Sequence, residues 1–112
     1  MSSRAESVLV DRSAPIFAAL GDPTRLSIVA RLSREGPLSI TRLTDGTSVS
    51  RQAITKHLLV LATAGVVADA RRGRERVFAL ESRPLVEARR QLDRISARWD
   101  RAIGRLRAMV EE

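Results

Sequence analysis

Apolar side chains recur along this chain at two different periods, and the change of period divides it into elements. Up to residue 64 they recur every three or four positions, which is the spacing of helices that bury one side. From residue 66 to 81 apolar and polar positions alternate, which predicts two strands of a β-hairpin. Interruptions by glycine and proline predict four helices before the hairpin, at residues 14–20, 23–35, 39–45 and 50–64.

Four residues are suited to begin these helices. Ser13 is the expected N-cap of the first, with Pro15 in its first turn, and Asp22 followed by Pro23 begins the second. Ser39 and Ser50 are placed to cap the third and fourth. Residues 1–12 precede the first predicted helix, and we expect them to be a flexible N-terminus.

Residues 39–64 predict a helix-turn-helix, because two helices are joined there by a short turn that contains glycine. In the second of them, Ile54, Leu58 and Leu61 share one face. Polar residues occupy the other face near its start. This arrangement offers the polar N-terminal part of the second helix to solvent.

A third apolar pattern follows Pro84 and predicts a long helix over residues 84–110. Its apolar positions are spaced alternately three and four apart, which is a heptad seam: Leu85, Ala88, Leu92, Ile95, Trp99, Ala102, Leu106 and Met109. A helix of this length spans roughly 40 Å, more than one small domain covers. We therefore expect a second chain to pack there, the alternative being that the seam packs wholly on its own core. The expected dimer-interface residues are Phe17, Leu85, Leu92, Ile95, Trp99 and Leu106.

The composition fits one domain over residues 1–112, of mainly α class with a minor β component. Hydrophobic residues make up 44% and charged residues 29%, which is an ordinary globular mixture. The chain has no cysteine and one histidine, so thiolate sites and multi-histidine metal centres within one chain are excluded. Aromatic residues make up only 3%, too few for a platform that stacks single-stranded bases.

Positive charge is concentrated in the middle of the chain. The net charge is +7, and residues 50–76 carry six basic and two acidic side chains, so +4 lies in this segment. A polyanion is the partner that such a surface favours. The longest apolar run near the N-terminus, Val8 to Val10, is too short for a signal peptide or a membrane span, so we expect a cytoplasmic protein without membrane contact. We recognise no nucleophile elbow, phosphate-binding glycine loop or carboxylate pair, and expect no catalytic residue.

Together the elements predict a winged helix-turn-helix with a two-stranded wing at residues 66–81 and a long C-terminal dimerisation helix. A polar helix fits the major groove of double-stranded DNA, where Arg pairs with guanine and Gln with adenine. Thr55 suits a thymine methyl group or a phosphate, and Lys56 a phosphate or a guanine. The candidate DNA-binding residues are Ser50, Arg51, Gln52, Thr55 and Lys56 in the helix and Arg71, Arg72, Arg74 and Arg76 in the wing.

Two stretches of the sequence resemble the ArsR family of bacterial transcriptional repressors. They read LGDPTRLSIVARLSREGPLSITRL from residue 20 and SVSRQAITKHLLVLATAGVVADARRGRERVFAL from residue 48. The resemblance implies a homodimer that binds a palindromic operator and represses transcription. It also places His57 at a family histidine position near the DNA, where a purely structural histidine is the alternative.

The chain departs from the metal-sensing members of that family. The third helix has no thiol, and the last helix has acidic residues but no histidine, so we expect no metal site and no cofactor. The inducer is not identified by the sequence, although Trp99 is a candidate to line an inducer pocket. The alternative function is a non-specific architectural protein that binds DNA or RNA.

Overall fold

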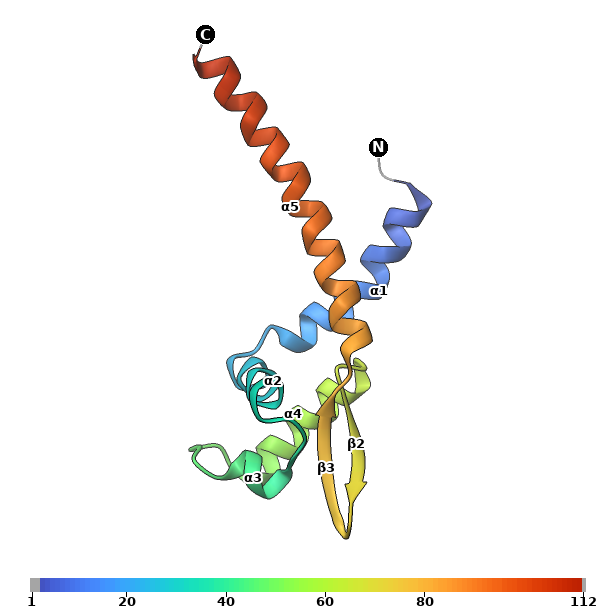
Figure 1. Cartoon of the computed structure of the whole chain (residues 1–112), viewed down its shortest axis with the longest axis vertical. Helices are drawn as coiled ribbons and strands as arrows, with labels where there is room; N and C mark the ends of the chain where they lie inside the picture. The colour runs from blue at the N-terminus through green and yellow to red at the C-terminus, as the bar shows by residue number, and fades with distance from the viewer. Residues whose placement is uncertain (1–2, 112) are drawn as a thin grey trace.

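Helices make up most of the structure, a computed structural model that describes residues 3–111 (Figure 1). Three strands form a small sheet beside them, and the last helix projects far from the rest. In chain order the elements are α1 (Arg4–Leu20), α2 (Pro23–Glu35), β1 (Leu38–Ser39), α3 (Ile40–Thr44), α4 (Arg51–Thr63), β2 (Val67–Arg72), β3 (Glu75–Leu80) and α5 (Ser82–Glu111).

The first helix begins ten residues earlier than the pattern predicts. Ser3 is its N-cap and accepts the backbone N–H of Glu6, whereas Ser13 is buried inside the helix and Pro15 lies beyond its middle. The prediction of a flexible N-terminus is therefore wrong for residues 4–12, and residues 1 and 2 lie outside the described part. The cause is tertiary contact, because ion pairs to α5 hold this half of the helix in place.

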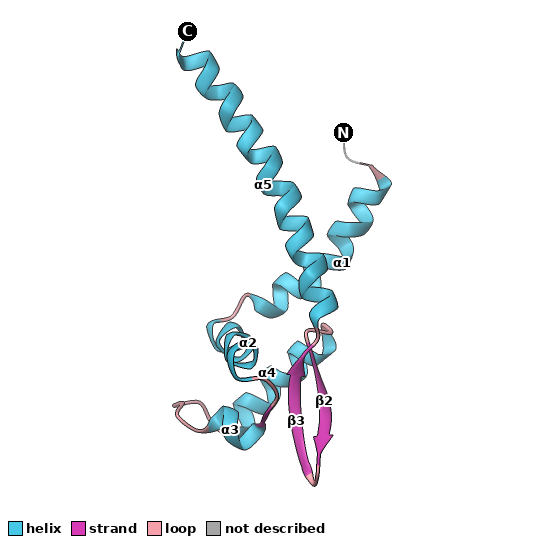
Figure 2. Cartoon of the chain, in the orientation of Figure 1, coloured by secondary structure: helices cyan, strands magenta, loops and turns pink. Residues whose placement is uncertain are grey.

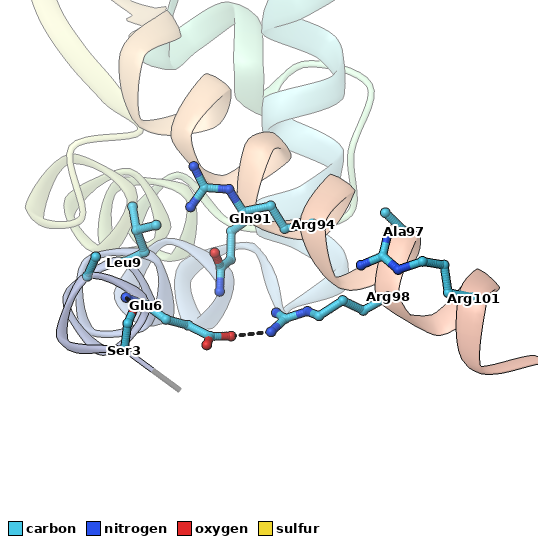
Figure 3. A pocket seen from close by; sticks show the side chains of 9 residues that line it. Ser3, Glu6, Leu9, Gln91, Arg94, Ala97, Arg98 and Arg101 are labelled. Atoms are coloured by element: carbon cyan, nitrogen blue, oxygen red, sulfur yellow. Dashed lines mark hydrogen bonds and ion pairs between the residues drawn. The ribbon is translucent and has the colours of Figure 1, made fainter. Parts of the chain in front are cut away.

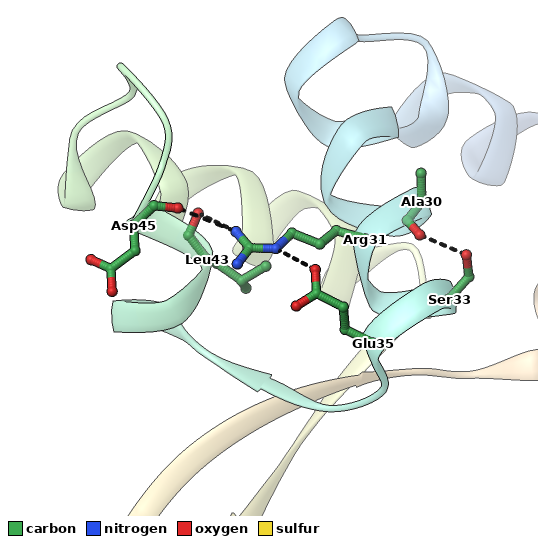
Figure 4. A network of polar contacts seen from close by, with 6 residues as sticks. All are labelled: Ala30, Arg31, Ser33, Glu35, Leu43 and Asp45. Atoms are coloured by element: carbon green, nitrogen blue, oxygen red, sulfur yellow. Dashed lines mark hydrogen bonds and ion pairs between the residues drawn. The ribbon is translucent and has the colours of Figure 1, made fainter.

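The core lies where α2, α3 and α4 meet the sheet. The predicted positions of these three helices are confirmed, and Asp22, Ser39 and Ser50 each cap the helix that follows. Arg31 on α2 also fastens the end of α3, because its guanidinium donates to the backbone oxygens of Leu43 and Asp45 (Figure 4). The largest fully buried side chains are Leu43, Ile54, Leu58, Leu61 and Val66.

The sheet contains the predicted hairpin and one additional strand (Figure 2). Strands β2 and β3 pair antiparallel, and Gly73, with φ of 65°, takes the first position of their two-residue turn. The strand that we did not predict is β1, where Leu38 pairs with Phe78 and Ser39 with Val77. Two residues are too few to show an alternating pattern, so β1 exists only through its pairing with the hairpin.

Helix α5 is 30 residues long and only its first part packs on the body of the protein. Ala88 is buried against the core and Leu85 packs beside it, whereas every side chain from Leu92 to Asp100 is exposed. The projecting part gives the molecule a longest dimension of 65 Å (Figure 1). The fold thus places the hairpin tip and the free end of α5 at opposite ends of the molecule.

Candidate nucleic-acid interface

Helix α4 presents a polar face to solvent because its apolar face is fixed in the core. Ile54, Leu58 and Leu61 are all buried. The hydroxyl oxygen of Ser50 accepts the backbone N–H of Ala53 at 3.1 Å and so fixes where the helix begins. Four of the predicted residues line one shallow cleft of about 530 Å³ on the exposed face: Arg51, Gln52, Thr55 and Lys56.

Arg51 is held in position by the preceding helix. Its guanidinium donates to the hydroxyl oxygen of Thr41 on α3 at 2.9 Å, while the side chain remains exposed. The hydroxyl of Thr55 donates to the backbone oxygen of Arg51 at 2.8 Å. Thr55 therefore uses its hydroxyl proton within the helix, which leaves its methyl group as the part suited to a base edge.

The wing brings like charges together. Arg71 lies directly opposite Arg76 in the β2–β3 register, an arrangement that destabilises a hairpin. Part of this repulsion is relieved, since Arg76 pairs with Asp69 at 3.0 Å and stacks over the ring of Phe78 at 5.0 Å. A polyanion along the hairpin would relieve the rest.

A second cleft joins the wing to the helix-turn-helix. It measures about 590 Å³, and Arg51, Arg74 and Arg76 line it together with Arg42 on α3. Arg42 and Thr41 were not predicted from the sequence. The signal was present, because Ile40 and Leu43 of the same short helix face inward and so leave positions 41 and 42 on the outer face. The structure thus gathers cationic side chains from three elements around one concave surface.

His57 lies behind this surface. Its side chain is half-buried, with Nδ1 3.3 Å from a guanidinium nitrogen of Arg25 and 3.9 Å from the carboxylate of Asp22. A guanidinium only donates hydrogen bonds, so in the contact with Arg25 the Nδ1 atom is the acceptor. The pKa of Asp22 is held below its ordinary value, chiefly because the backbone N–H of Arg25 donates to this carboxylate. These contacts favour the structural alternative for His57 and leave only Nε2 to reach a phosphate.

Comparison with known proteins identifies the family. The family described as "Helix-turn-helix domain" matches residues 20–69. The HTH-type transcriptional regulator Rv2034 of Mycobacterium tuberculosis is 44% identical over 87 residues, which cover 78% of each chain. An ArsR-like transcriptional regulator from Rhodococcus sp. RHA1 superposes with a TM-score of 0.74 at 37% identity, over 88% of this chain and 92% of that one.

The chain belongs to the ArsR family of HTH-type transcriptional regulators. It is a DNA-binding transcriptional regulator with a winged helix-turn-helix fold, as the sequence pattern predicts, and the family is one of regulators, not of enzymes. A relative with a stated direction of regulation is the HTH-type transcriptional repressor SmtB of Mycobacterium tuberculosis. It is 35% identical over 72 residues, which are 64% of this chain and 53% of the repressor.

Two further findings on this ArsR-family chain concern metal binding and membrane spans within residues 3–111. Among residues 3–111 no three histidine, cysteine or acidic side chains are grouped closely enough to hold a metal ion. Within the same residues no helix combines the length and apolarity needed to cross a bilayer.

The predicted dimer-interface residues fall into two groups. Phe17 and Leu85 pack partly against their own core. The other four line the projecting part of α5 and are exposed: Leu92, Ile95, Trp99 and Leu106. The seam therefore does not pack wholly on its own chain. Trp99 is 65% exposed, so within one chain it does not form the wall of an enclosed pocket.

Proposed function

We propose that this ArsR-family protein is a cytoplasmic homodimer that binds a palindromic operator in double-stranded DNA and represses transcription. The observation that carries the proposal is the concave cationic surface shared by α3, α4 and the wing. Repression is proposed because a dimer bound across a promoter blocks its use, and because SmtB, a relative, is named a repressor. No catalytic step forms part of this proposal.

Helix α4 is the element that enters the major groove. Arg51, held by Thr41, pairs with the two acceptors of a guanine, and Gln52 pairs with an adenine. Thr55 offers its methyl group to a thymine, and Lys56 neutralises a phosphate. Ser50 lies at the helix N-terminus, where backbone N–H groups and its hydroxyl favour a phosphate.

The wing contacts the sugar–phosphate backbone next to that groove. Arg72 and Arg74 are exposed at the hairpin tip. Arg71 lies opposite Arg76, and a phosphate beside this pair supplies the counter-charge that the two arginines lack. Arg42 extends the same set of phosphate contacts from α3. His57 joins this set only through Nε2. Contacts of this kind set affinity and register without reading sequence.

The exposed seam of α5 makes the dimer. Large apolar side chains at four heptad positions outside the body of the protein favour a second copy of the same helix. Two copies related by a two-fold axis place two α4 helices one DNA turn apart, about 34 Å, and so read an inverted repeat.

The test is fluorescence anisotropy of the full chain on a duplex from its own promoter and on a scrambled duplex, over a series of salt concentrations. Arg51→Ala is expected to cost about 1–3 kcal/mol on the promoter and little on the scrambled duplex. Arg74→Ala is expected to weaken both duplexes alike and to reduce the salt slope by about one. Arg107→Ala, at the far end of α5, is the control with the same loss of charge. Equal affinity of the parent protein for both duplexes would favour the non-specific alternative.

A further inference from the structure

The first half of α1 and the middle of α5 enclose a cleft of about 440 Å³ (Figure 3). This is a volume in which proteins hold small organic molecules. Two ion pairs connect the same helices, Glu6 with Arg98 at 2.5 Å and Arg12 with Glu87 at 2.7 Å. The first half of α1 and the middle of α5 lie far from the wing and from α4 (Figure 1), so the DNA-binding surface does not account for the cleft.

The charge on its walls is positive. Arg94, Arg98 and Arg101 line it from α5, and Glu6 is its one acidic residue. Glu6 forms an ion pair with Arg98, whereas within residues 3–111 neither Arg94 nor Arg101 forms an ion pair. The apolar part of the wall comes from Leu9 on α1 and Ala97 on α5, and Ser3 and Gln91 add uncharged polar groups. An anion with a hydrocarbon body matches both kinds of surface.

The buried side chain of Gln91 has an amide oxygen that lacks a hydrogen-bond donor among the described residues. Its side chain is 4% exposed and projects between α1 and α5, where its Oε1 atom is buried and accepts no hydrogen bond from residues 3–111 (Figure 3). Native proteins leave few buried polar atoms unpaired, and an unpaired one needs an explanation. A ligand that carries a hydrogen-bond donor would supply the missing partner.

We propose that this cleft binds a small organic anion: a carboxylate with an apolar body and a hydroxyl group. The carboxylate lies among Arg94, Arg98 and Arg101, and the hydroxyl donates to Oε1 of Gln91. Competition with Glu6 for Arg98 weakens the attachment of α1 to α5.

The regulatory consequence rests on the proposed function. Helix α5 carries both this cleft and the apolar seam, so a ligand that loosens α1 from α5 alters the assembly that spaces the two α4 helices. Bound ligand is therefore expected to lower operator affinity.

Calorimetric titration of the full chain without DNA tests the site independently of the operator. The probe is 4-hydroxybenzoate, which has the carboxylate, the apolar ring and the hydroxyl. Benzoate, which lacks the donor, is expected to bind about fivefold more weakly. The uncharged 4-hydroxybenzyl alcohol is expected to bind more weakly by about tenfold or more.

Two variants locate the binding. Gln91→Leu fills the same space without an amide and should reduce the preference for 4-hydroxybenzoate over benzoate to about one. Arg94→Gln changes an exposed residue and should weaken binding of both carboxylates by about tenfold. Arg89→Gln, an exposed position on α5 outside the cleft, is the matched control and should leave binding unchanged.

Three results would overturn the proposal. One is the absence of heat from 4-hydroxybenzoate at millimolar concentration. Another is binding to which Gln91→Leu and Arg94→Gln make no difference. The third is a loss of the dimer in sedimentation when either variant is made, since the cleft would then belong to the interface between copies. None of these results bears on operator binding by the unliganded protein, which anisotropy measures separately.

Discussion

Helices α4 and α5 are both amphipathic, but only α4 buries its apolar face in the core of its own chain. Leu58 of α4 is 1% exposed, whereas Trp99 and Leu106 of α5 are 65% and 60% exposed. The same type of side chain, at the same helical spacing, therefore stabilises the fold in one helix and remains available for a partner in the other. The contrast separates the apolar face that is buried in the chain's own core from the apolar face to which we assign the proposed dimer contact.

The largest effect is expected from the buried face of α4. Leu58→Ala removes a core side chain and leaves a cavity, so it should lower the free energy of unfolding by about 2–5 kcal/mol. Leu59→Ala, its 67% exposed neighbour, is the matched control and should change stability by only about 0.5 kcal/mol or less. Urea denaturation measures both. Equal losses in the two variants would remove the distinction between the faces.

The exposed face of α5 is expected to show the opposite behaviour. Trp99→Ala combined with Leu106→Ala should weaken dimerisation by about 2 kcal/mol or more, because large side chains at an interface centre contribute most of its energy. The secondary structure seen by circular dichroism should persist. Sedimentation equilibrium measures the association, with Arg90→Ala on the opposite side of α5 as the control. A parent protein that is monomeric at micromolar concentration would contradict the assignment of the seam.

The same contrast explains what could be predicted from the sequence. Segments with strong local signals were predicted well, such as α4 with Ser50 as its cap, the hairpin of β2 and β3, and the long helix α5. Features that depend on distant contacts were not. Strand β1 depends on β3, and residues 4–12 become helical against α5.

The candidate DNA interface shows the same division. The polar face of α4 follows from periodicity, and four of the predicted side chains share one cleft in the structure. The outward position of Thr41 and Arg42 also follows from periodicity, but the contact between Thr41 and Arg51 depends on how α3 packs beside α4, which no local pattern contains. His57 lies in a family pattern, but its neighbours Arg25 and Asp22 come from a helix more than thirty residues earlier in the chain.

A smaller effect is expected from the support of the polar face. Thr41→Val keeps the shape of the side chain but removes the acceptor that holds Arg51. Binding to the promoter duplex should weaken by about 1 kcal/mol, with an unchanged salt slope because no charge is lost. Thr41→Ser restores the hydroxyl and should recover the affinity. If the valine and serine variants bind alike, Thr41 does not position Arg51.

The smallest effect concerns Asp22, which lies behind α4. Its pKa in the folded state is below the ordinary value of 3.8, mainly because the backbone N–H of Arg25 donates to it. A depressed pKa contributes stability that is complete above pH 3.8 and is lost as the pH falls through the lower folded value. Asp22→Asn keeps an N-cap without a titrating group, so its unfolding free energy should depend less on pH in that window. Denaturation at a series of acidic pH values measures the difference, and identical pH profiles would contradict the prediction.

The number of chains bound to one operator duplex tests the central claim most directly. Sedimentation velocity of the protein with a promoter duplex that contains one inverted repeat gives this number. We predict two chains per duplex, and a Trp99→Ala, Leu106→Ala variant that binds more weakly while retaining its fold. A stable complex of one chain with one duplex, or a complex whose stoichiometry grows with duplex length and ignores the repeat, would contradict it.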